Sequence, residues 1–454
     1  MFSRPRERRC FILPIKHSFR GGVHPLKHEG KQQTREKQTV DFVSDSVTIP
    51  MAMHLGAPST PCVKKGDHVL MGQIIGDPVG FLGLPVHSGI SGIVTAVEKR
   101  QQMGGAPVDC VCIENDFKDE WIVLFPLGNV ETVEKSLIIP AIKNAGICGM
   151  GGATFPTYVK LNIPEGKTCD TIIVNGAECE THLTSDYRLM LEDTILVIDG
   201  LRAVMRALDV KRGIIAIEDN KPSVIKLMQS AIAGRNGVEL MTMRTKYPQG
   251  SEKQLIKAAT GREVPQKKLP IDVSTIMLNA ATAAAIATAI IDGKPLISRI
   301  TTVTGHVKEP KNLRLRIGTE ISDIIGFCGG FDGEIGKIVM GGAMTGLCAP
   351  DDKISITKGS GGILVLNQKE AREKDEDPCI RCGRCVSVCP MGLNPYLLKH
   401  YCDIGDLKSA EKLNVLDCML CGCCSFACPS KRFLTASFKH AKDKIAYLAR
   451  KEQK

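Results

Sequence analysis

The chain has 454 residues, 19 cysteines and a formal net charge of +10, and aromatic residues make up only 4% of it. At about 150 residues per domain, this length predicts roughly three domains with ample core. A long chain does not need the disulfides that staple small secreted domains, so these cysteines indicate an intracellular protein with reduced thiols. The few aromatic residues are not interleaved with basic ones, which argues against nucleic acid as a partner.

No stretch of the sequence reaches the roughly 18 consecutive apolar residues of a membrane span. The nearest stretch, residues 276–291, is rich in Ala and Thr and contains Asn279. The apolar run after the basic start is too short for a signal peptide and contains Pro14. We therefore expect a protein that is soluble or peripheral to a membrane, with a charge that suits an anionic membrane face or an acidic ferredoxin.

Residues 1–120 are predicted to form a β domain, because short β-branched runs broken by glycine replace any long helical period. Residues 63–76 and 86–94 resemble the hammerhead of biotinyl and lipoyl carrier domains. The turn that carries the modified lysine in those domains reads PVHSG here and has no lysine. We therefore expect a docking or structural role for this domain rather than a swinging arm.

Residues 121–298 are predicted to form an α/β domain, in which apolar strands alternate with helices. The strands are expected at 171–175, 213–217, 238–243 and 276–278, and the helices at 194–208, after Pro222, at 251–260 and up to Gly293. Gly261 marks the end of the helix at 251–260. This alternation indicates a largely parallel sheet.

A glycine-rich stretch, GICGMGGATFPT, occupies residues 146–157 of this domain, and Lys160 follows it. Glycines let backbone amides approach a phosphate or a ring closely, and the lysine adds positive charge. The stretch does not match the ordinary dinucleotide fingerprint, and by itself a plain turn is a fair alternative. Two further segments favour a ligand site: NGAECE at 175–180, where a strand ends, and YPQGSEK at 247–253, where a helix begins.

Residues 300–350 return to β character, and they are expected to bridge the flanking domains rather than to bind a ligand of their own. The charged residues 367–378 have no apolar period, which predicts an exposed linker or a solvated helix. The tail beyond Ser437 is expected to be a basic, solvated helix.

Two cysteine runs dominate residues 366–454 and are separated by a gap that has room for one helix. Each run reads C-x2-C-x2-C-x3-C-P, the ferredoxin spacing for a [4Fe–4S] cluster, and two complete runs argue against a zinc site or a disulfide knot. In two-cluster ferredoxins the last cysteine of each run ligates the other cluster. On that pattern the first predicted set is Cys379, Cys382, Cys385 and Cys428, and the second is Cys418, Cys421, Cys424 and Cys389, with Cys423 as a bystander.

Several sequence motifs resemble those of the C subunit of the Rnf complex, which is the ion-translocating ferredoxin:NAD+ oxidoreductase. The resemblance extends along nearly the whole chain. The motifs are FRGGVHP at 19–25, GMGGATFPTYVKL at 149–161, NGAECE at 175–180, YPQGSEKQLI at 247–256, GREVP at 261–265 and the cysteine runs. The middle of the chain is similar to the flavin-bearing, NADH-oxidising subunit of respiratory complex I.

The resemblance implies a multidomain α/β fold. It consists of a β barrel-sandwich hybrid domain at 1–120, a Rossmann-like FMN/NAD(H) domain at 121–298, a β-grasp module at 299–365 and a helical ferredoxin-type domain with two [4Fe–4S] clusters at 366–454.

The resemblance also implies which residues bind FMN and NAD(H), and it implies no acid–base or nucleophilic catalytic residue. Three loop glycines, one lysine and two asparagines would bind FMN: Gly149, Gly151, Gly152, Lys160, Asn175 and Asn279. One aromatic ring, three carboxylates and a glycine beside one of them would contact the dinucleotide: Phe155, Glu178, Glu180, Glu252 and Gly250. The chain departs from the related patterns at Met150, Ala177 and Thr181, which stand in place of an arginine, an aspartate and a proline.

The implied function is that of a peripheral subunit at the cytoplasmic face of the cell membrane. It would pass electrons between the iron–sulfur clusters and NAD(H) through FMN, which exchanges both hydride and single electrons. Its partners would be an iron–sulfur subunit and integral membrane subunits. The alternatives are a soluble NADH-dependent flavin and iron–sulfur reductase, like the cobalamin reductases or the electron donor of proline reductase, and a non-catalytic electron-transfer scaffold.

Overall fold

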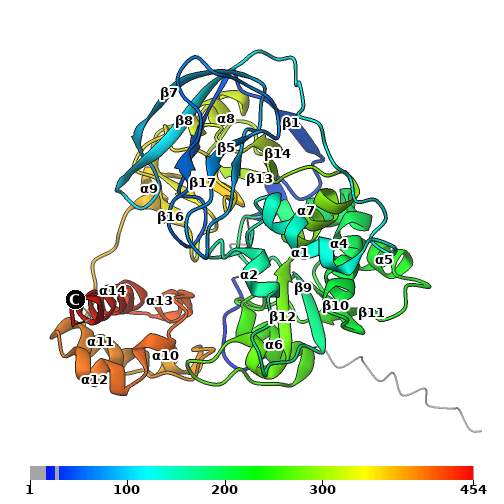
Figure 1. Ribbon diagram of the computed structural model, residues 1–454. Coiled ribbons are helices and arrows are strands. Elements are labelled where there is room, and N and C mark those ends of the chain that lie inside the picture. Colours follow the sequence, from blue (N-terminus) through cyan, green and yellow to red (C-terminus); the bar gives the residue numbers. More distant parts are fainter. Residues whose placement is uncertain (1–16, 26–29, 453–454) are drawn as a thin grey trace, which may run out of the picture.

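The computed structural model describes residues 17–25 and 30–452. They form four β-sheets with flanking helices, followed by a separate helical region at the C-terminus (Figure 1). No helix in these two ranges is long and apolar enough to cross a membrane.

The N-terminal β unit consists of two small antiparallel sheets that share one core. The first sheet has the order β2 (Ser46–Pro50), β8 (Pro107–Asn115), β7 (Gly92–Gln101) and β4 (His68–Val69). The second has the order β3 (Thr60–Pro61), β5 (Ile74–Asp77) and β6 (Val86–His87). Ile49, Ile75 and Ile113 are fully buried between them. This is the all-β unit that the glycine-broken β-branched runs predict.

The middle of the chain forms a four-stranded parallel sheet. Its order is β11 (Val238–Met243), β10 (Arg212–Glu218), β9 (Thr171–Gly176) and β12 (Thr275–Asn279). Its helices are α1 (Lys135–Asn144), α2 (Thr157–Leu161), α3 (Ser185–Glu192), α4 (Thr194–Ala207), α5 (Pro222–Ala231), α6 (Glu252–Thr260) and α7 (Ala280–Ile291).

Both faces of this sheet are covered, which explains why β9, β10 and β12 are largely apolar. Ile172 and Val174 of β9 point to the face packed by α1, α4, α5 and α7, whereas Ile173 points to the face packed by α6. Successive side chains of a strand alternate between faces, so each strand joins two cores. The predicted strands and helices coincide with these elements, and Gly261 ends α6 in the left-handed conformation with φ 74°.

The fourth sheet has the order β1 (Thr39–Phe42), β14 (Lys311–Arg316), β13 (Ser298–Gly305), β17 (Gly362–Asn367), β15 (Ile335–Met340) and β16 (Leu347–Cys348). Helix α8 (Ile321–Phe327) contributes Ile321 and Ile324 to its core. Strand β1 pairs in parallel with β14, so this early segment lies in the fourth sheet and not in the N-terminal unit that the sequence predicts for it. Strand β17 runs two residues past the predicted domain limit at 365.

The C-terminal region is helical and is joined to the fourth sheet by α9 (Gln368–Ala371) and an extended, mostly exposed linker (Figure 1). Its helices are α10 (Arg384–Ser387), α11 (Pro395–Asp403), α12 (Leu407–Lys412), α13 (Cys423–Ala427) and α14 (Leu434–Glu452). The gap between the cysteine runs holds two α-helices and the short 3-10 helix Val415–Asp417, where the sequence suggested room for one helix. Gly405, with φ 73°, follows α11 in the left-handed conformation that ends helices, so α12 begins separately.

Helices α4 and α7 cross so closely that only glycine fits at one position. A Cβ atom on Gly200 would lie 1.8 Å from the backbone oxygen of Ala283. We expect Gly200→Ala to lower the free energy of unfolding by about 1–3 kcal/mol, the usual cost of overpacking a core. Chemical denaturation followed by circular dichroism measures this.

The matched control is Gly326→Ala, also within a helix. A Cβ atom there meets no protein atom within 4 Å, so the change should be neutral or stabilising by up to about 1 kcal/mol. Equal effects of the two substitutions would contradict the close helix crossing.

Candidate functional site

Two asparagines lie side by side where the order of the parallel sheet reverses. The chain proceeds outward from β9 to β10 and β11 and then returns to the other side of β9 as β12. Asn175 at the end of β9 is in register with Asn279 at the end of β12. Open parallel sheets bind ligands outside the carboxyl ends of their strands at this reversal point. The topology therefore locates the candidate site at these two residues.

The glycine-rich loop covers this point and packs on the start of α7. The Gly149 amide donates to the Phe155 carbonyl at 2.9 Å, and the Met150 amide donates to the Thr282 hydroxyl at 2.9 Å. A Cβ atom on Gly151 would lie 2.8 Å from the Asn279 side-chain nitrogen, whereas Gly152 faces open space. Glycine thus allows the loop to touch the helix start on one side and leaves a free surface on the other.

The asparagine side chains tie the site to two further segments. The Asn175 amide donates to the Gly250 carbonyl at 2.7 Å. The Asn279 amide donates to the Asp186 carboxylate at 2.7 Å, and its oxygen accepts from the Ala281 amide as the N-cap of α7. The positive end of the helix dipole therefore points into the site, which favours an anionic group such as a phosphate.

Lys160 and Glu252 form an ion pair at the same edge. Their charged atoms are 3.0 Å apart, and the Lys160 ammonium also donates to the Met277 carbonyl at 3.1 Å. About one third of each side chain is exposed, so both remain accessible. The structure thus brings the predicted lysine together with a carboxylate from the YPQGSEK segment.

Glu178 lies beneath the site and caps helix α3. Its carboxylate accepts the backbone amides of Asp186 at 2.7 Å and Tyr187 at 3.2 Å, and its side chain is 4% exposed. The Lys31 ammonium donates to the Glu178 carbonyl at 2.6 Å. Burial raises the pKa of Glu178 to about 7 and also raises the pKa of Asp186, because the charged forms lose solvation.

Glu180 is held by the turn between β15 and β16. Its carboxylate accepts from the Met344 amide at 3.2 Å and from the Thr345 hydroxyl. A Cβ atom on Gly342 would lie 2.3 Å from one Glu180 carboxylate oxygen, so the turn lies directly on this side chain. Glu180, which the sequence predicts to contact the dinucleotide, thus has hydrogen-bond partners from the fourth sheet.

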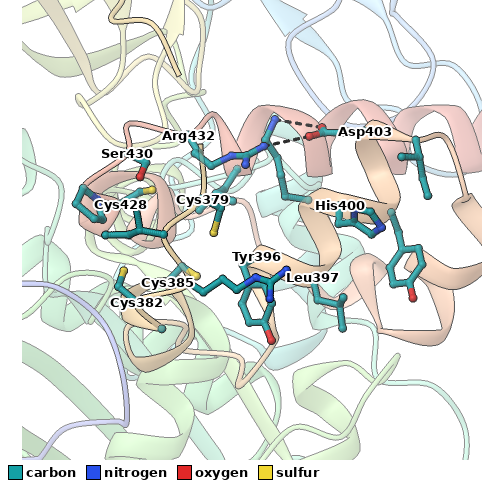
Figure 2. Close-up of a pocket in the computed structure, with 18 residues that line it drawn as sticks. Cys379, Cys382, Cys385, Tyr396, Leu397, His400, Asp403, Cys428, Ser430 and Arg432 are labelled. Carbon is teal, nitrogen blue, oxygen red and sulfur yellow. Dashed lines mark hydrogen bonds and ion pairs between the residues drawn. The ribbon is translucent and has the colours of Figure 1, made fainter. Parts of the chain in front are cut away.

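The first predicted cysteine set lines a cavity of about 490 Å³ in the C-terminal region. Figure 2 shows Cys379, Cys382, Cys385 and Cys428 around one space, with Tyr396 and His400 of α11 nearby. Cys379 and Cys382 are exposed. The last cysteine of the second run therefore lies with the first three of the first run.

The second predicted set is more deeply enclosed and faces the parallel sheet domain. Cys389, Cys418, Cys421 and Cys424 line one small cavity, which Cys423 also borders. The Tyr247 hydroxyl donates to the Cys421 carbonyl at 2.8 Å, and the Gln254 amide donates to the Pro390 carbonyl at 3.2 Å. Within the described ranges, no three His, Cys, Asp or Glu side chains converge on a single metal ion. The donor set that each cavity offers, four cysteine thiols, is the one that a [4Fe–4S] cluster requires.

Four family models match successive parts of the chain. They are the RnfC barrel sandwich hybrid domain at 17–118, the Nuo51 FMN-binding domain at 142–288, the SLBB domain at 300–347 and a 4Fe–4S binding domain at 373–394.

Relatives match nearly the whole chain. It is 42% identical over 443 residues to the C subunit of the Na+-translocating ferredoxin:NAD+ oxidoreductase complex of Acetobacterium woodii, covering 97% of this chain and 100% of the relative. It is 44% identical to the C subunit of the proton-translocating ferredoxin:NAD+ oxidoreductase complex of Clostridium ljungdahlii, covering 88% of each. It is 41% identical to the C subunit of the ion-translocating oxidoreductase complex of Rhodobacter capsulatus, covering 94% of this chain and 83% of the relative.

The chain belongs to the family of C subunits of ion-translocating oxidoreductase complexes. The resemblance seen in the sequence words and the multidomain fold class are both confirmed. An FMN-binding domain and a 4Fe–4S binding domain are present, the latter matched over the first cysteine run. The soluble reductases considered as an alternative are not the family that the chain joins.

A solved structure shares the fold at low identity. In the crystal structure of an NAD+-reducing [NiFe]-hydrogenase in the H2-reduced state, one chain has a TM-score of 0.51 and 18% identity, covering 70% of this chain and 64% of that chain. This likeness concerns the fold alone.

Sequence reasoning missed the buried charges beneath the site. Asp186 follows NGAECE by six residues and opens α3, so an acidic residue in a first helical turn was the available signal. Lys31 lies about 150 residues from Glu178 in the chain, and no local sequence pattern indicates that the two residues are in contact. Cys423, considered a bystander, is fully buried against Tyr247 at the boundary between the two domains.

The raised pKa of Glu178 predicts a pH dependence of stability. Between its ordinary value of 4.5 and about 7, the folded state holds more protons than the unfolded state, so stability falls as pH rises through this window. Glu178→Gln keeps one of the two oxygens that accept the α3 amides and removes the titration. We expect a smaller decrease in melting temperature between pH 5 and pH 7.5 for the variant, measured by scanning calorimetry. An unchanged decrease would contradict a buried, titrating Glu178.

Proposed function

We propose that this chain transfers electrons between iron–sulfur clusters and NAD(H) through FMN, as a peripheral subunit at the cytoplasmic face of a membrane-bound, ion-translocating complex. One observation carries the proposal: residues 247–254 contribute both Gly250 to the reversal-point site and Tyr247 to the second cysteine set. A single short segment thus links the site at Asn175 and Asn279, which we term the flavin-type site, to the second cysteine set. The names of the relatives supply the substrates, ferredoxin and NAD+.

The cysteine positions support two [4Fe–4S] clusters with crossed ligands. We propose Cys379, Cys382, Cys385 and Cys428 as ligands of the first, and Cys389, Cys418, Cys421 and Cys424 as ligands of the second. Each set lines one cavity and comes from both runs, as in two-cluster ferredoxins.

The residues at the reversal point fit FMN. Bound there, FMN exchanges a hydride with nicotinamide and single electrons with clusters. We propose that the start of α7 with Asn279 and the ammonium of Lys160 hold its phosphate, whereas the amides of Gly149, Gly151 and Gly152 approach its ring. Asn175 orients the ring side of the site through its bond to Gly250. Supporting observations are the open surface at Gly152 and the helix dipole at Asn279.

For NAD(H), we propose binding at the open side of the glycine loop, beside Phe155 and Glu252. Phe155 closes the loop through its carbonyl, and Glu252 is partly exposed next to Lys160. Glu178 and Glu180 remain proposed contacts of the dinucleotide. Both also have protein partners, because Glu178 accepts amides of α3 and Glu180 accepts from the turn of the fourth sheet.

The exposure of the two cysteine sets favours a direction of entry for single electrons. Cys379 and Cys382 are exposed, whereas Cys421 and Cys424 are buried next to the flavin-type site. We propose that a partner iron–sulfur subunit meets the first set and that the second set relays electrons inward. Integral membrane subunits of the same complex then carry the ion movement.

Gly152→Ala tests the flavin contact without disturbing the protein. The added methyl group meets no protein atom within 4 Å, so we expect an unchanged melting temperature for the FMN-free protein. FMN binding, followed by flavin fluorescence, should weaken by about 1–3 kcal/mol if the ring packs there. Unchanged FMN affinity would contradict the assignment.

The neighbouring substitution serves as the control for this test. Gly151→Ala pushes on the N-cap Asn279, so it should lower stability by about 1 kcal/mol as well as FMN affinity.

Cysteine substitutions test the cluster assignment and the order of carriers. In the assembled complex, Cys385→Ser and Cys424→Ser should each remove about four of eight irons. Both should abolish electron entry from the partner and leave NADH-dependent flavin reduction intact, as measured by stopped-flow absorbance. Cys402→Ser is the control, because Cys402 lies in the same domain but outside both cavities. Loss of flavin reduction by NADH in a folded Cys424→Ser variant would refute the order.

A further inference from the structure

The FRGGVHP word at residues 19–25 has a defined place in the structure, between the parallel sheet domain and the C-terminal cysteine domain. Residues 17–25, which we term the N-terminal strap, run along residues 243–247. The Val23 and Tyr247 backbones exchange two hydrogen bonds of 2.8 and 2.9 Å, and the Arg244 amide donates to the His17 carbonyl at 2.9 Å. The strap is therefore fixed to the parallel sheet domain at both of its ends.

Lys246 anchors the middle of the strap to the same domain. Its ammonium donates to the Phe19 carbonyl at 2.8 Å and lies 4.4 Å from the centre of the Phe19 ring. Such a cation–π contact adds to the hydrogen bond where solvent is partly excluded. The aromatic residue and the lysine thus hold the strap in place beside the glycine pair that follows Phe19.

The opposite side of the strap lies on the first cysteine run. The Gly22 amide donates to the Val388 carbonyl at 2.8 Å. A Cβ atom on Gly21 would lie 2.7 Å from the Cys389 carbonyl oxygen, and one on Gly22 would lie 2.5 Å from the Tyr247 carbonyl oxygen. Both glycines have φ of 78°, which side chains rarely adopt. The glycine pair thus allows three backbones to approach one another with no side chain between them.

Tyr247 continues this contact to the second cysteine run. It is 3% exposed, and its hydroxyl donates to the Cys421 carbonyl. Val23, Tyr247, Cys421 and Cys423 form one buried apolar cluster. The strap and Tyr247 together touch the backbones of Cys389 and Cys421, which are the predicted ligands of the second cluster from the two different runs.

The covalent connection to the C-terminal domain comes from the fourth sheet and not from the parallel sheet domain. Helix α9 ends at Ala371, and residues 372–378 have no regular structure and are mostly exposed. Glu373 pairs with Lys337 of the fourth sheet at 2.8 Å, and Glu376 pairs with Lys399 of the C-terminal domain at 3.2 Å. This linker therefore does not itself join the second cysteine set to the parallel sheet domain. Besides the strap and Tyr247, polar contacts from Gln254 to Pro390 and from Gln266 to Asn414 cross the boundary.

We propose that the N-terminal strap, with Tyr247, is a positioning element that holds the second cysteine set at a fixed distance from the flavin-type site and keeps water out of the boundary. This inference rests on the proposed function, because it assigns the strap to the electron step between those two sites. Electron transfer slows steeply with distance, so an element that fixes the separation of two carriers sets the rate between them. The strap residues neither bind a cofactor nor react.

Gly21→Ala in the holoprotein is the direct test. The new methyl group collides with the Cys389 backbone, which cannot rotate away, so the strap and the cysteine run must separate. We expect NADH-dependent flavin reduction to keep its rate, whereas the following cluster reduction slows severalfold, because electron transfer slows steeply when two carriers move apart. Stopped-flow absorbance resolves the two steps.

Gly261→Ala is the matched control. Gly261 has φ of 74°, close to that of Gly21, but a Cβ atom there meets no protein atom within 4 Å. The two variants therefore share the backbone penalty of about 1 kcal/mol and differ only in the contact. An equal slowing of cluster reduction in both variants, or none in Gly21→Ala, would overturn the proposal.

Hydrogen exchange gives a readout that does not depend on activity. Amides in peptides spanning 385–392 and 418–424 should exchange faster in Gly21→Ala than in Gly261→Ala, because the boundary opens. Unchanged exchange in these peptides would refute the positioning role of the strap, whether or not NADH reduces a flavin in this protein. Absence of NADH-dependent flavin reduction in the wild-type protein would refute only the proposed function.

If Gly21→Ala does not fold, Tyr247→Phe provides a second test of the positioning role. This change removes only the hydroxyl donor to Cys421 and keeps the ring. The electron paramagnetic resonance signal of the second reduced cluster should shift and that of the first should not. Identical spectra of both clusters in the variant and the wild type would count against the positioning role.

Discussion

The parallel pairing of β9 with β12 is the constraint on which the site depends. It sets Asn175 beside Asn279, and each amide then holds a separate segment, one carrying Gly250 and the other carrying Asp186. The glycine loop can approach only because Gly151 has no side chain to collide with Asn279. A shift of β12 by one residue would turn Asn279 to the face opposite Asn175, so the register of these two strands determines the arrangement of the candidate site.

Burying the charges beside the candidate site costs free energy, and these charges are arranged in compensating groups. Glu178 is stabilised by two backbone amides and by Lys31, and Lys221 pairs with Glu218 at 3.2 Å. Removing one member of such a group leaves an uncompensated charge, whereas the complete group contributes mainly a defined geometry. The candidate site thus lies on buried polar groups that come from segments distant in sequence.

The sequence predicted the elements well where local physics determines them. Strand β9 and the end of α6 at Gly261 were predicted to within one residue of their observed limits, because buried parallel strands are largely apolar and helix ends carry glycine. The cysteine spacing likewise predicted two sets that the structure gathers around two cavities. The position of β1 and the partner of Glu180 were not predictable, because the surfaces that select them are formed by residues more than 150 positions away.

Strand β1 has a consequence for how this chain is made. Its partner β14 lies about 270 residues later, so a ribosome adding about 5–20 residues per second leaves β1 unpaired for tens of seconds. During that interval the N-terminal β unit can close without it, since its own sheets need no residue before Ser46. The early segment can therefore join the fourth sheet only after β14 has been made, and it then covers the edge of β14 that would otherwise be open to pairing between chains.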